Sequence, residues 1–346
     1  MRTIKTALLS YGMSGKVFHA PFLELHPGFK LLGAWERSKK LIQADYPEVI
    51  SYPTLEDVLA SDAELIVVNT PIDSHFEYAK KVLQAGKHAI VEKAFTTTVA
   101  EAEELKALAI EKGLKLSVFQ NRRWDSDFKT VKKIRDDGVL GELVDAEFHF
   151  DRYTPTLSQK AHKESVNDGS GILKDLGPHL IDQALFLFGF PQAVHADIRI
   201  TREQSLIDDS LDICLFYHDF RVRLKAGFFN REMIPSYVLQ GRKGSFFKAR
   251  GDLQEDELKI SKKPNLTTWG TEDANLKGIL HTEIDGEIIR KNIPTLQGNY
   301  YDYFDGMYQS IITNSIEPVT AQEGINVMKI IEAAIKSNTE KRRIEF

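Results

Sequence analysis

The sequence of 346 residues has one cysteine, no long apolar run and no excess of basic charge, and each scarcity excludes a class of protein. The single cysteine, Cys214, excludes an internal disulfide and suits a reducing compartment. It lies in Leu211–Phe216, which reads as a strand, so we interpret it as a small core residue rather than a nucleophile. No apolar run has the length of a membrane span, and the first residues lead into a predicted strand without the apolar segment of a signal peptide. We therefore expect a cytoplasmic protein that does not bind a membrane.

Charge and length limit the partners and the number of domains. The chain has 45 Lys and Arg against 50 Asp and Glu, a formal net charge of −5, so it lacks the basic excess of a nucleic-acid binder. Hydrophobic residues make up 42% and charged residues 27%, which are ordinary values for a globular protein. A chain of 346 residues exceeds the size at which single hydrophobic cores stop growing, so two domains are expected.

The first 37 residues follow the order of a dinucleotide-binding βαβ unit, namely strand, glycine turn, helix, strand and acid. Two apolar runs, Ile4–Leu9 and Phe29–Trp35, are predicted strands. Between them lie the turn Ser10–Gly15 and a helix-like segment, Lys16–His26. The N-terminus of such a helix offers unpaired N–H groups to an anion, so the stretch predicts a bound nucleotide.

Two glycines and one acid carry this interpretation. Gly12 lets the backbone approach a pyrophosphate, and Gly15 lets the helix pack closely on the strand. Glu36 lies 21 positions after Gly15, near the roughly 20 expected of the acid that binds ribose hydroxyls. Ser10 stands where the fingerprint has its first glycine, and the alternative is a turn whose glycines serve packing alone. In this stretch the predicted cofactor-binding residues are Tyr11, Gly12, Met13, Ser14, Gly15, Glu36 and Arg37.

Strands and helices then alternate as far as Phe119, which predicts a parallel, doubly wound sheet for a first domain of residues 1–121. Strands are predicted at 49–52, 65–68, 89–91 and 114–119, and helices begin near Thr54, His75 and Thr98. In such sheets ligands lie beyond the carboxyl ends of the strands. Besides the glycine turn and Glu36, that rule selects Thr70, Pro71, Glu92, Lys93, Gln120 and Asn121.

Lys93 directly follows a predicted buried strand, so its amine is expected to be partly removed from water. Beside a bound nicotinamide it could stabilise an alkoxide or exchange a proton. The alternative is a surface lysine that pairs with Glu92 and has no further role.

Residues 122–346 are expected to form an α+β domain with a large, mostly antiparallel, open-faced sheet. From 144 to 153 apolar and polar residues alternate, as in a strand with one covered face. Further strands are predicted at 193–200, 211–217, 222–229, 237–240, 244–248 and 287–293, and helices at 127–136, 300–313 and 321–339. The polar stretch from Arg250 to Gly278, with an isolated Trp269, is predicted to be a loop.

Three polar residues of this second domain, Asp175, His179 and Asp182, have the spacing of one helix face. A carboxylate one turn from a histidine can fix the tautomer of the ring and stabilise its protonated form, which suits a general acid–base. A metal site is a weaker alternative, because no further ligands are identified. A salt bridge on the helix surface is the structural alternative. Pro178 lacks an N–H, so the helix is expected to kink there or to start late.

Together these residues resemble the Gfo/Idh/MocA family of nicotinamide-dependent oxidoreductases, and the resemblance covers nearly the whole chain. It rests on the order and spacing of several short motifs. They are the turn at 11–15, Phe18-His19-Ala20-Pro21-Phe22, Thr70-Pro71-x-x-x-His75, Ala85-Gly86-Lys87-His88, Glu92-Lys93, Asn121-Arg122-Arg123-Trp124, Asp175-x-Gly177-x-His179-x-x-Asp182 and Ile330-Ile331-Glu332-Ala333-Ala334. The second and sixth motifs are most similar to the branch that holds scyllo-inositol dehydrogenases of the NADP type.

The resemblance implies an NAD(P)-dependent oxidoreductase that transfers hydride between nicotinamide and a secondary alcohol or ketone of a sugar, inositol or related polyol. It implies that Lys93 lies at the active site, that Asp175 and His179 face substrate, and that a homodimer or homotetramer forms through the second sheet. On this interpretation His179 exchanges a proton with the substrate hydroxyl, Lys93 stabilises the alkoxide, and Asp175 orients His179 or binds a neighbouring hydroxyl. Thr70, Pro71, His75, Glu92, Lys93 and Asn121 complete the predicted cofactor-binding set.

Trp124, Asp151 and Arg152 are our candidates for further substrate contacts. The alternatives are a packing tryptophan and a surface ion pair. Two rival functions use the same scaffold. One is a non-catalytic sensor of nucleotide or sugar, and the other is a glycosidase that uses NAD transiently.

Two features leave details of the site open. Ala94 replaces the proline of the family's Glu-Lys-Pro motif, and we expect a trans Lys93–Ala94 bond because a cis bond before a non-proline residue costs about 2.5–4 kcal/mol. Glu36 favours the 2′-hydroxyl of NAD, since two like charges at ~4 Å repel by about 4 kcal/mol at an effective dielectric constant near 20. The basic run that follows it favours the 2′-phosphate of NADP, so the cofactor is NAD or NADP. That run is Arg37, Ser38, Lys39 and Lys40.

Overall fold

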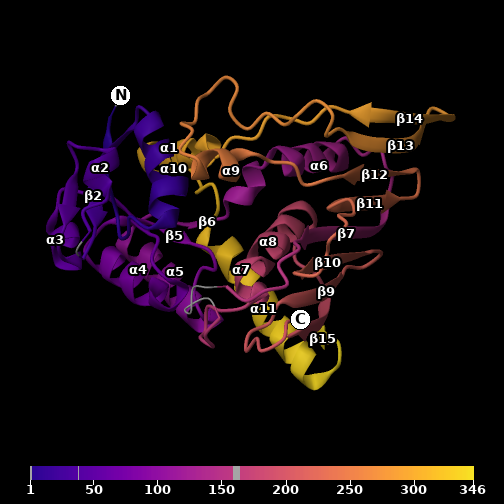
Figure 1. The fold of residues 1–346 in the computed structure, drawn as a ribbon, viewed down its shortest axis with the longest axis horizontal. Coiled ribbons are helices and arrows are strands. Elements are labelled where there is room, and N and C mark those ends of the chain that lie inside the picture. The colour runs from indigo at the N-terminus through magenta and orange to yellow at the C-terminus, as the bar shows by residue number, and fades with distance from the viewer. Residues whose placement is uncertain (1, 38, 159–163) are drawn as a thin grey trace. The chain divides into compact units, whose positions relative to one another are not determined.

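The computed structural model describes residues 2–37, 39–158 and 164–346, which form two compact units (Figure 1). The first unit runs to Trp124 and includes two later stretches, Leu253–Trp269 and Asn299–Ile325. The second unit takes Asp125–Asp252, Gly270–Gly298 and the chain from Asn326 onward. The chain thus returns twice to the first unit after leaving it.

The first unit contains a six-stranded parallel sheet in the order β3-β2-β1-β4-β5-β6. This is the strand order of the doubly wound dinucleotide-binding fold, so the predicted fold class is confirmed. Strand β4 is completely buried, which explains why the sequence there is a continuous apolar run. The strands are β1 (Ile4–Leu8), β2 (Phe29–Trp35), β3 (Ile50–Tyr52), β4 (Leu65–Val68), β5 (His88–Glu92) and β6 (Leu116–Phe119).

Helices connect these strands and start where the sequence signals predict. Thr54 and Thr98 both form capping boxes, with Asp57 and Glu101 respectively, and Gly113 ends α5 at a positive φ of 65°. A π-helical turn, η1, spans Gly15–His19 and precedes α1. The other helical segments of the first unit are α1 (Ala20–Leu25), α2 (Ile42–Asp45), α3 (Leu55–Ala60), η2 (Ile72–Ser74), α4 (His75–Gln84), α5 (Val99–Lys112), η3 (Asn121–Trp124), α9 (Gln254–Lys259) and α10 (Tyr301–Thr313).

Helix α10 supplies aromatic side chains to the core of the first unit. The Phe304 ring stacks on Phe22 with 5.7 Å between centroids and an angle of 7° between the ring planes. The Tyr303 hydroxyl donates a 2.8 Å hydrogen bond to Ser117 Oγ on β6. Because these side chains are completely buried, the late stretch 299–325 is part of the dinucleotide-binding half.

The second unit is built on a nine-stranded sheet in the order β14-β13-β12-β11-β7-β10-β9-β8-β15. Among the strand pairs of the described residues in this sheet, only β7 with β10 is parallel, so the predicted mostly antiparallel sheet is confirmed. The strands are β7 (Leu143–Asp151), β8 (Ala193–Arg199), β9 (Ser210–Phe216), β10 (Arg221–Gly227), β11 (Tyr237–Gly241), β12 (Gly244–Lys248), β13 (Gly278–Ile284), β14 (Glu287–Ile293) and β15 (Ile344–Glu345). Its helices are α6 (Ser126–Asp136), α7 (Ile172–Asp175), α8 (Gly177–Phe188) and most of α11 (Ala321–Glu340).

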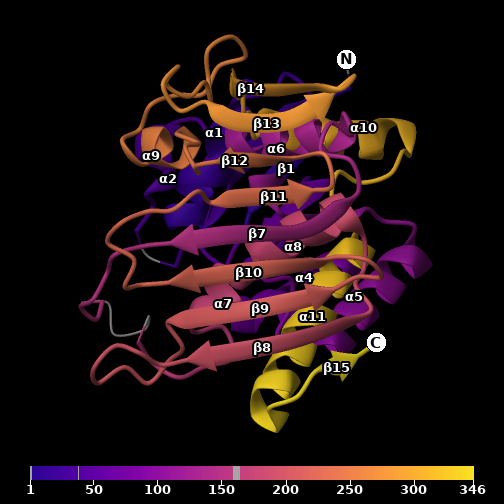
Figure 2. The ribbon, with the colours of Figure 1, turned by 90° about the vertical axis from the view of Figure 1, so that its right-hand side faces the viewer.

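One face of this sheet is open. Helix α8 contacts β7 and β10, and α6 contacts β12. Figure 2 looks onto the other face, where no helix lies in front of β7, β9 or β10. The alternation of Phe148 and Phe150 with Glu147 and His149 follows from this arrangement, because only one face packs against helices.

The predicted loop from Arg250 to Gly278 is partly wrong. It contains α9, and it is followed at once by β13, which the sequence did not predict. Helix α9 has six residues, which is too short to show an apolar period. Strand β15, which the sequence also did not predict, has only two residues. Trp269 is 1% exposed, and its ring meets Phe22 edge to face with 6.4 Å between centroids, so it anchors this stretch in the first unit.

No helix in the described part of the chain combines the length and apolar character that a membrane crossing requires.

Candidate functional site

The glycine turn after β1 is fixed by Asn69, which follows β4. Asn69 Oδ1 accepts a bond from the Ser10 N–H at 3.0 Å, and Asn69 Nδ2 donates to the Ser10 carbonyl at 2.8 Å. The Ser10 hydroxyl in turn accepts the Gly12 N–H at 3.1 Å. A Cβ on Gly15 would lie 2.2 Å from the Ser10 carbonyl oxygen, so this position needs glycine, as predicted. Ser10 is therefore compatible with the turn, and its hydroxyl binds one N–H that a phosphate could otherwise use.

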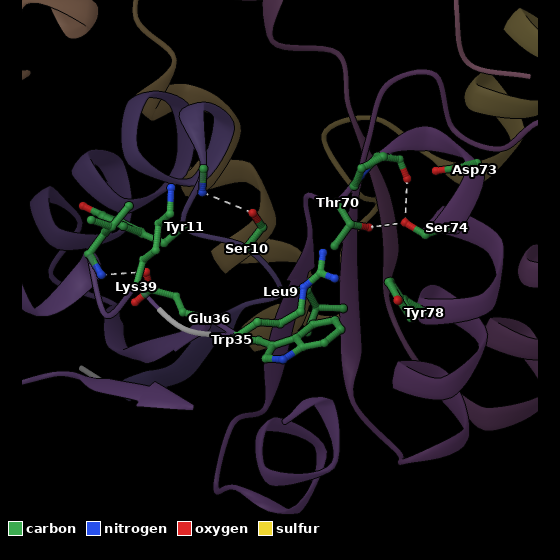
Figure 3. Close-up of a pocket in the computed structure, with 14 residues that line it drawn as sticks. Leu9, Ser10, Tyr11, Trp35, Glu36, Lys39, Thr70, Asp73, Ser74 and Tyr78 are labelled. Carbon is green, nitrogen blue, oxygen red and sulfur yellow. Dashed lines mark hydrogen bonds between the residues drawn. The ribbon is translucent and has the colours of Figure 1, made fainter. Parts of the chain in front are cut away.

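A pocket of about 520 Å³ opens beside this turn at the carboxyl ends of the strands (Figure 3). Its volume lies within the roughly 300–1,000 Å³ of small-molecule sites. Six residues of the predicted cofactor set line it, namely Tyr11, Gly12, Glu36, Arg37, Thr70 and Pro71. Eight further residues were absent from that set, namely Leu9, Ser10, Trp35, Lys39, Leu41, Asp73, Ser74 and Tyr78.

Some of these additions carry signals in the sequence. Trp35 is the last residue of β2, directly before Glu36. Ser74 ends η2, the short helical turn that directly follows Thr70 and Pro71. The Trp35 and Tyr78 rings meet edge to face with 5.6 Å between centroids, which brings together residues that are far apart in the sequence. Trp35 Nε1 is buried and has no hydrogen-bond partner among the described residues.

Tyr11 forms one wall of the pocket and is held by Asp45. Its hydroxyl donates to Asp45 Oδ2 at 2.8 Å, and Lys16 Nζ lies 2.8 Å from the same oxygen. Burial, helped by the bond to Asp45, raises the pKa of Tyr11, so the phenol is neutral at ordinary pH. Met13 is 60% exposed and does not line the pocket.

Glu36 is in the pocket but is already bonded by the protein. Its Oε1 accepts the Leu41 N–H at 2.7 Å, and its Oε2 accepts the Ile42 N–H and the Ser51 hydroxyl, both at 3.1 Å. Figure 3 shows the Glu36 side chain beside Lys39 on one side of the pocket. Glu36 therefore fixes the chain that leads into α2, with Arg37 and Lys39 in the pocket wall. Ser38 lies outside the described residues.

Glu92, the last residue of β5, forms hydrogen bonds with the glycine turn and with the helical turn η1 that follows it. Its Oε1 accepts hydrogen bonds from the Ser14 hydroxyl and from His19 Nε2, the latter at 2.9 Å. Burial opposes ionisation of this carboxyl, but the bonds from His19 and Ser14 outweigh it and hold the pKa of Glu92 below its usual range. Neither Ser14 nor Glu92 lines the pocket described above.

His75 is buried and connects two strand ends. One ring nitrogen, Nε2, lies 2.8 Å from the Thr70 carbonyl oxygen, and Nδ1 lies 2.9 Å from the Ala94 carbonyl oxygen. Burial lowers the pKa of His75. With 1% of its surface exposed, His75 is placed to hold Thr70 in the pocket wall rather than to touch a ligand itself.

The Lys93–Ala94 peptide bond is cis, so the expected trans bond is wrong. The expectation used only the general cost of a cis bond. In the structure Ala94 is 1% exposed, and its carbonyl oxygen lies 2.9 Å from His75 Nδ1, contacts that the local sequence does not reveal. Lys93 follows β5 directly, as predicted.

Two predicted residues follow β6 in the first unit. Asn121 is 5% exposed and begins η3. Trp124 ends η3, and its ring meets Tyr303 edge to face at 5.4 Å, which is a packing contact. The Trp124 carbonyl accepts bonds from Asn299 N–H and Gln254 Nε2, so the residue also fixes the returning chain.

In the second unit the predicted helix of Asp175 and His179 is broken between them. Asp175 ends α7 and is exposed, whereas His179 lies in the first turn of α8 and is 6% exposed. Pro178 occupies the start of α8, which confirms the predicted break. The α7 N-terminus is held by Asp208, whose Oδ2 accepts the Leu173 N–H at 2.7 Å.

The remaining candidates lie at the end of β7. Asp151 accepts a 3.0 Å bond from Asn230 Nδ2, and His149 Nδ1 lies 3.3 Å from its other oxygen. The Arg152 guanidinium lies over the Phe150 ring at 5.2 Å. Lys93 belongs to the first unit and both Asp175 and His179 to the second, so their joint action on one substrate stays a prediction.

Comparisons with known proteins match both halves of the chain. Residues 4–120 match the family description "oxidoreductase family, NAD-binding Rossmann fold", and residues 132–346 match "oxidoreductase family, C-terminal alpha/beta domain". The chain is 38% identical over 343 residues to scyllo-inositol 2-dehydrogenase (NADP(+)) IolW of Bacillus subtilis, an alignment that covers 99% of this chain and 96% of the relative. It is 37% identical over 336 residues to the uncharacterized oxidoreductase YdgJ of Escherichia coli, covering 96% of each.

A solved structure supports the same assignment. The crystal structure of an oxidoreductase from Bacillus cereus aligns with a TM-score of 0.93 at 29% identity and covers 99% of each chain. The pocket at the strand ends fits the nucleotide of an NAD-binding domain, because its lining combines a glycine turn, an aromatic side chain and two basic side chains. With this site, this fold and matches that span both units, the chain belongs to the Gfo/Idh/MocA family of NAD-binding oxidoreductases.

Proposed function

We propose that this protein is an NADP(H)-dependent dehydrogenase or reductase that acts on a secondary alcohol, or the matching ketone, of an inositol, sugar or related polyol. The observation that carries the proposal is the pocket beside the glycine turn. It opens at the edge of the parallel sheet at which Lys93 follows β5. The name of the Bacillus subtilis relative supports the polyol class. The nicotinamide, when bound, exchanges a hydride with the carbinol carbon of the substrate.

Three side chains handle the substrate in this proposal. Lys93 stabilises negative charge that develops on the substrate oxygen. His179 exchanges the proton of the substrate hydroxyl, and Asp175 orients His179 or binds a neighbouring hydroxyl. The burial of His179 suits a proton-transfer group, because water competes less for its ring nitrogens.

Replacement of His179 tests the proton-transfer role. His179→Ala should lower turnover by about 10²–10⁴ while the cofactor dissociation constant stays unchanged, because a general acid–base contributes about that factor. His195→Ala, at an exposed histidine of β8 in the same unit, is the matched control and should retain full turnover. Full turnover in His179→Ala would refute the role.

The pocket favours NADP over NAD. Within the described residues Glu36 accepts hydrogen bonds from the Leu41 and Ile42 N–H groups and from the Ser51 hydroxyl, so its carboxylate is less available to ribose hydroxyls. Arg37 and Lys39 line the same pocket and can bind a 2′-phosphate by charge-assisted hydrogen bonds. Dissociation constants for NADPH and NADH should differ by about tenfold or more in favour of NADPH, since such bonds contribute about 1.5–3 kcal/mol. Arg37→Ala and Lys39→Ala should weaken NADPH and leave NADH unchanged.

A panel of inositols, sugars and glycosides separates the proposal from its rivals. A dehydrogenase changes the absorbance of the nicotinamide with at least one polyol. A sensor would bind cofactor and change nothing, and an NAD-dependent glycosidase would release sugar without a net change in absorbance. Either result would overturn the proposed reaction.

We also propose that a homodimer or homotetramer forms through the open face of the nine-stranded sheet. Oppositely charged side chains on neighbouring strands pair across this face. Arg221 Nε of β10, for example, lies 2.6 Å from Asp145 Oδ2 of β7. Analytical ultracentrifugation tests the assembly. A monomer at micromolar concentration would contradict it.

A further inference from the structure

We propose that Glu92 is a positioning residue that couples the cofactor-binding turn to Lys93. The inference rests on the proposed function and adds a role that the glycine fingerprint does not assign. Glu92 ends β5, and Lys93 follows it directly. One carboxylate therefore stands between the turn that approaches the pyrophosphate and the lysine that acts on substrate.

The two oxygens of Glu92 serve different partners. Oε1 accepts from the Ser14 hydroxyl, in the turn, and from His19 Nε2, at the end of η1. Oε2 accepts the backbone N–H of Lys93 at 3.2 Å. A shift of the turn thus moves Oε1, and the rigid carboxylate transmits that shift to the backbone of Lys93.

His19 makes the turn side of this connection rigid. Its ring is completely buried and lies 4.3 Å from the Phe119 ring and 6.0 Å from Phe304, so it cannot swing away. The helical turn that carries it is π-helical, with the Ala20 N–H bonded to the Gly15 carbonyl. π-helical turns are rare and occur frequently at functional sites. Here the turn directs His19 toward Glu92.

The carboxylate also supplies charge. The titratable groups around Glu92 are His19 and Lys93, with His75 and Tyr303 further away. The bonds from Ser14 and His19 keep Glu92 ionised despite its burial. Lys93 follows this carboxylate directly in the chain, and its positive charge is one of the influences that lower the pKa of Glu92.

The two oxygens of Glu92 predict two measurable defects. Ser14→Ala removes one contact to Oε1, so the cofactor dissociation constant should rise about tenfold, and turnover at saturating cofactor should also fall because Glu92 transmits the change to Lys93. Glu92→Gln keeps an oxygen for Ser14 and His19 but loses the charge and places an NH₂ group against the Lys93 N–H. It should lower turnover at least tenfold while the cofactor dissociation constant stays within about threefold.

A double-mutant cycle on cofactor binding gives the test that needs no substrate. Ser14→Ala and Glu92→Ala should each raise the dissociation constant about tenfold, and the double variant should raise it no further than Glu92→Ala alone. A hundredfold rise in the double variant would show independent effects and would overturn the coupling. This binding measurement is valid even if the protein turns over no polyol. A failure of the proposed function and a failure of the proposed coupling therefore give different results.

Controls exclude a loss of folding. Glu104→Gln, at an exposed glutamate of α5 that pairs with Lys80, should change neither constant. Circular dichroism of Glu92→Gln and Ser14→Ala should match that of the unaltered chain, since both changes nearly conserve shape. If Glu92→Gln folds and turns over at the normal rate, Glu92 does not position Lys93.

Discussion

Asn69 holds the backbone of Ser10 from both sides, accepting its N–H and donating to its carbonyl. Asn69→Ala leaves two groups of a tight turn without partners, so it should lower the free energy of unfolding by about 2–4 kcal/mol. Asn69→Asp has the same shape but sets a second oxygen against the Ser10 carbonyl, and should cost at least as much. Urea unfolding measures both. If Asn69→Asp left the free energy of unfolding unchanged, the bond that Asn69 donates to the Ser10 carbonyl would contribute nothing to stability.

Glu36 gives a prediction that separates two roles for the same acid. As the residue that fixes the chain before α2, it accepts three hydrogen bonds, and Glu36→Gln would place an NH₂ group against one of those donors. We expect NADPH and NADH both to bind more weakly, with their ratio nearly unchanged. A selective loss of NADH binding would instead show that Glu36 binds ribose hydroxyls. Dissociation constants for both cofactors decide between the roles.

Lys248 and Glu272 form a completely buried ion pair in the second unit, with 2.6 Å between Nζ and Oε2. Lys248 Nζ also donates to the Leu276 carbonyl at 2.8 Å, and Ser126 Oγ donates to Glu272 Oε1 at 2.6 Å. Lys248→Met should destabilise the fold by about 3–5 kcal/mol, because it leaves a buried carboxylate without its counter-ion.

The double variant Lys248→Met/Glu272→Met is the informative companion. It removes both charges, so it should unfold at a urea concentration closer to that of the unaltered chain than Lys248→Met does. If the single and double variants were equally unstable, lost packing rather than an unpaired charge would explain the loss.

Glu255 makes the first unit sensitive to acid. Burial opposes its ionisation, but Arg122 and Lys259 outweigh burial and lower its pKa to about 2, from an ordinary value of 4.5. Because the folded pKa is below the unfolded one, the stabilisation is present above about pH 4.5 and is lost as pH falls toward 2. The difference of 4.5 − 2 = 2.5 pKa units corresponds to about 3 kcal/mol.

The variant Glu255→Gln checks this dependence. Its free energy of unfolding should change less between about pH 6 and about pH 3 than that of the unaltered chain. Equal slopes in the two proteins would assign the acid sensitivity to other carboxyls.

Local patterns account for most of the fold. The run Leu65–Val68 predicts β4 to the residue, and the capping box at Thr98 and Glu101 predicts the start of α5, because both depend on neighbours in the chain. Helix α9 is too short to show an apolar period, and the contacts that hold it are with residues distant in the sequence, which a local pattern does not reveal. Arg122 pairs with Glu255, more than a hundred positions away.

The site divides in the same way. The strand-end rule finds Gly12, Glu36 and Thr70 because parallel strands place their ends together. It does not find the direction of a side chain, which is set by distant partners. Glu36 turns to Ser51, and His75 turns to Ala94 across the cis bond. These are the positions where sequence reasoning gave the wrong geometry or none.

The late return of α10 has a consequence for biosynthesis. Tyr303 and Ser117 are bonded although 186 positions separate them, so the ribosome must make most of the protein before the first core can close. At about 5–20 residues per second, this interval lasts roughly 10–40 seconds. During that time Phe22 of α1 and Phe119 of β6 lack the Phe304 ring that later packs against them, so the incomplete first unit leaves apolar surface uncovered.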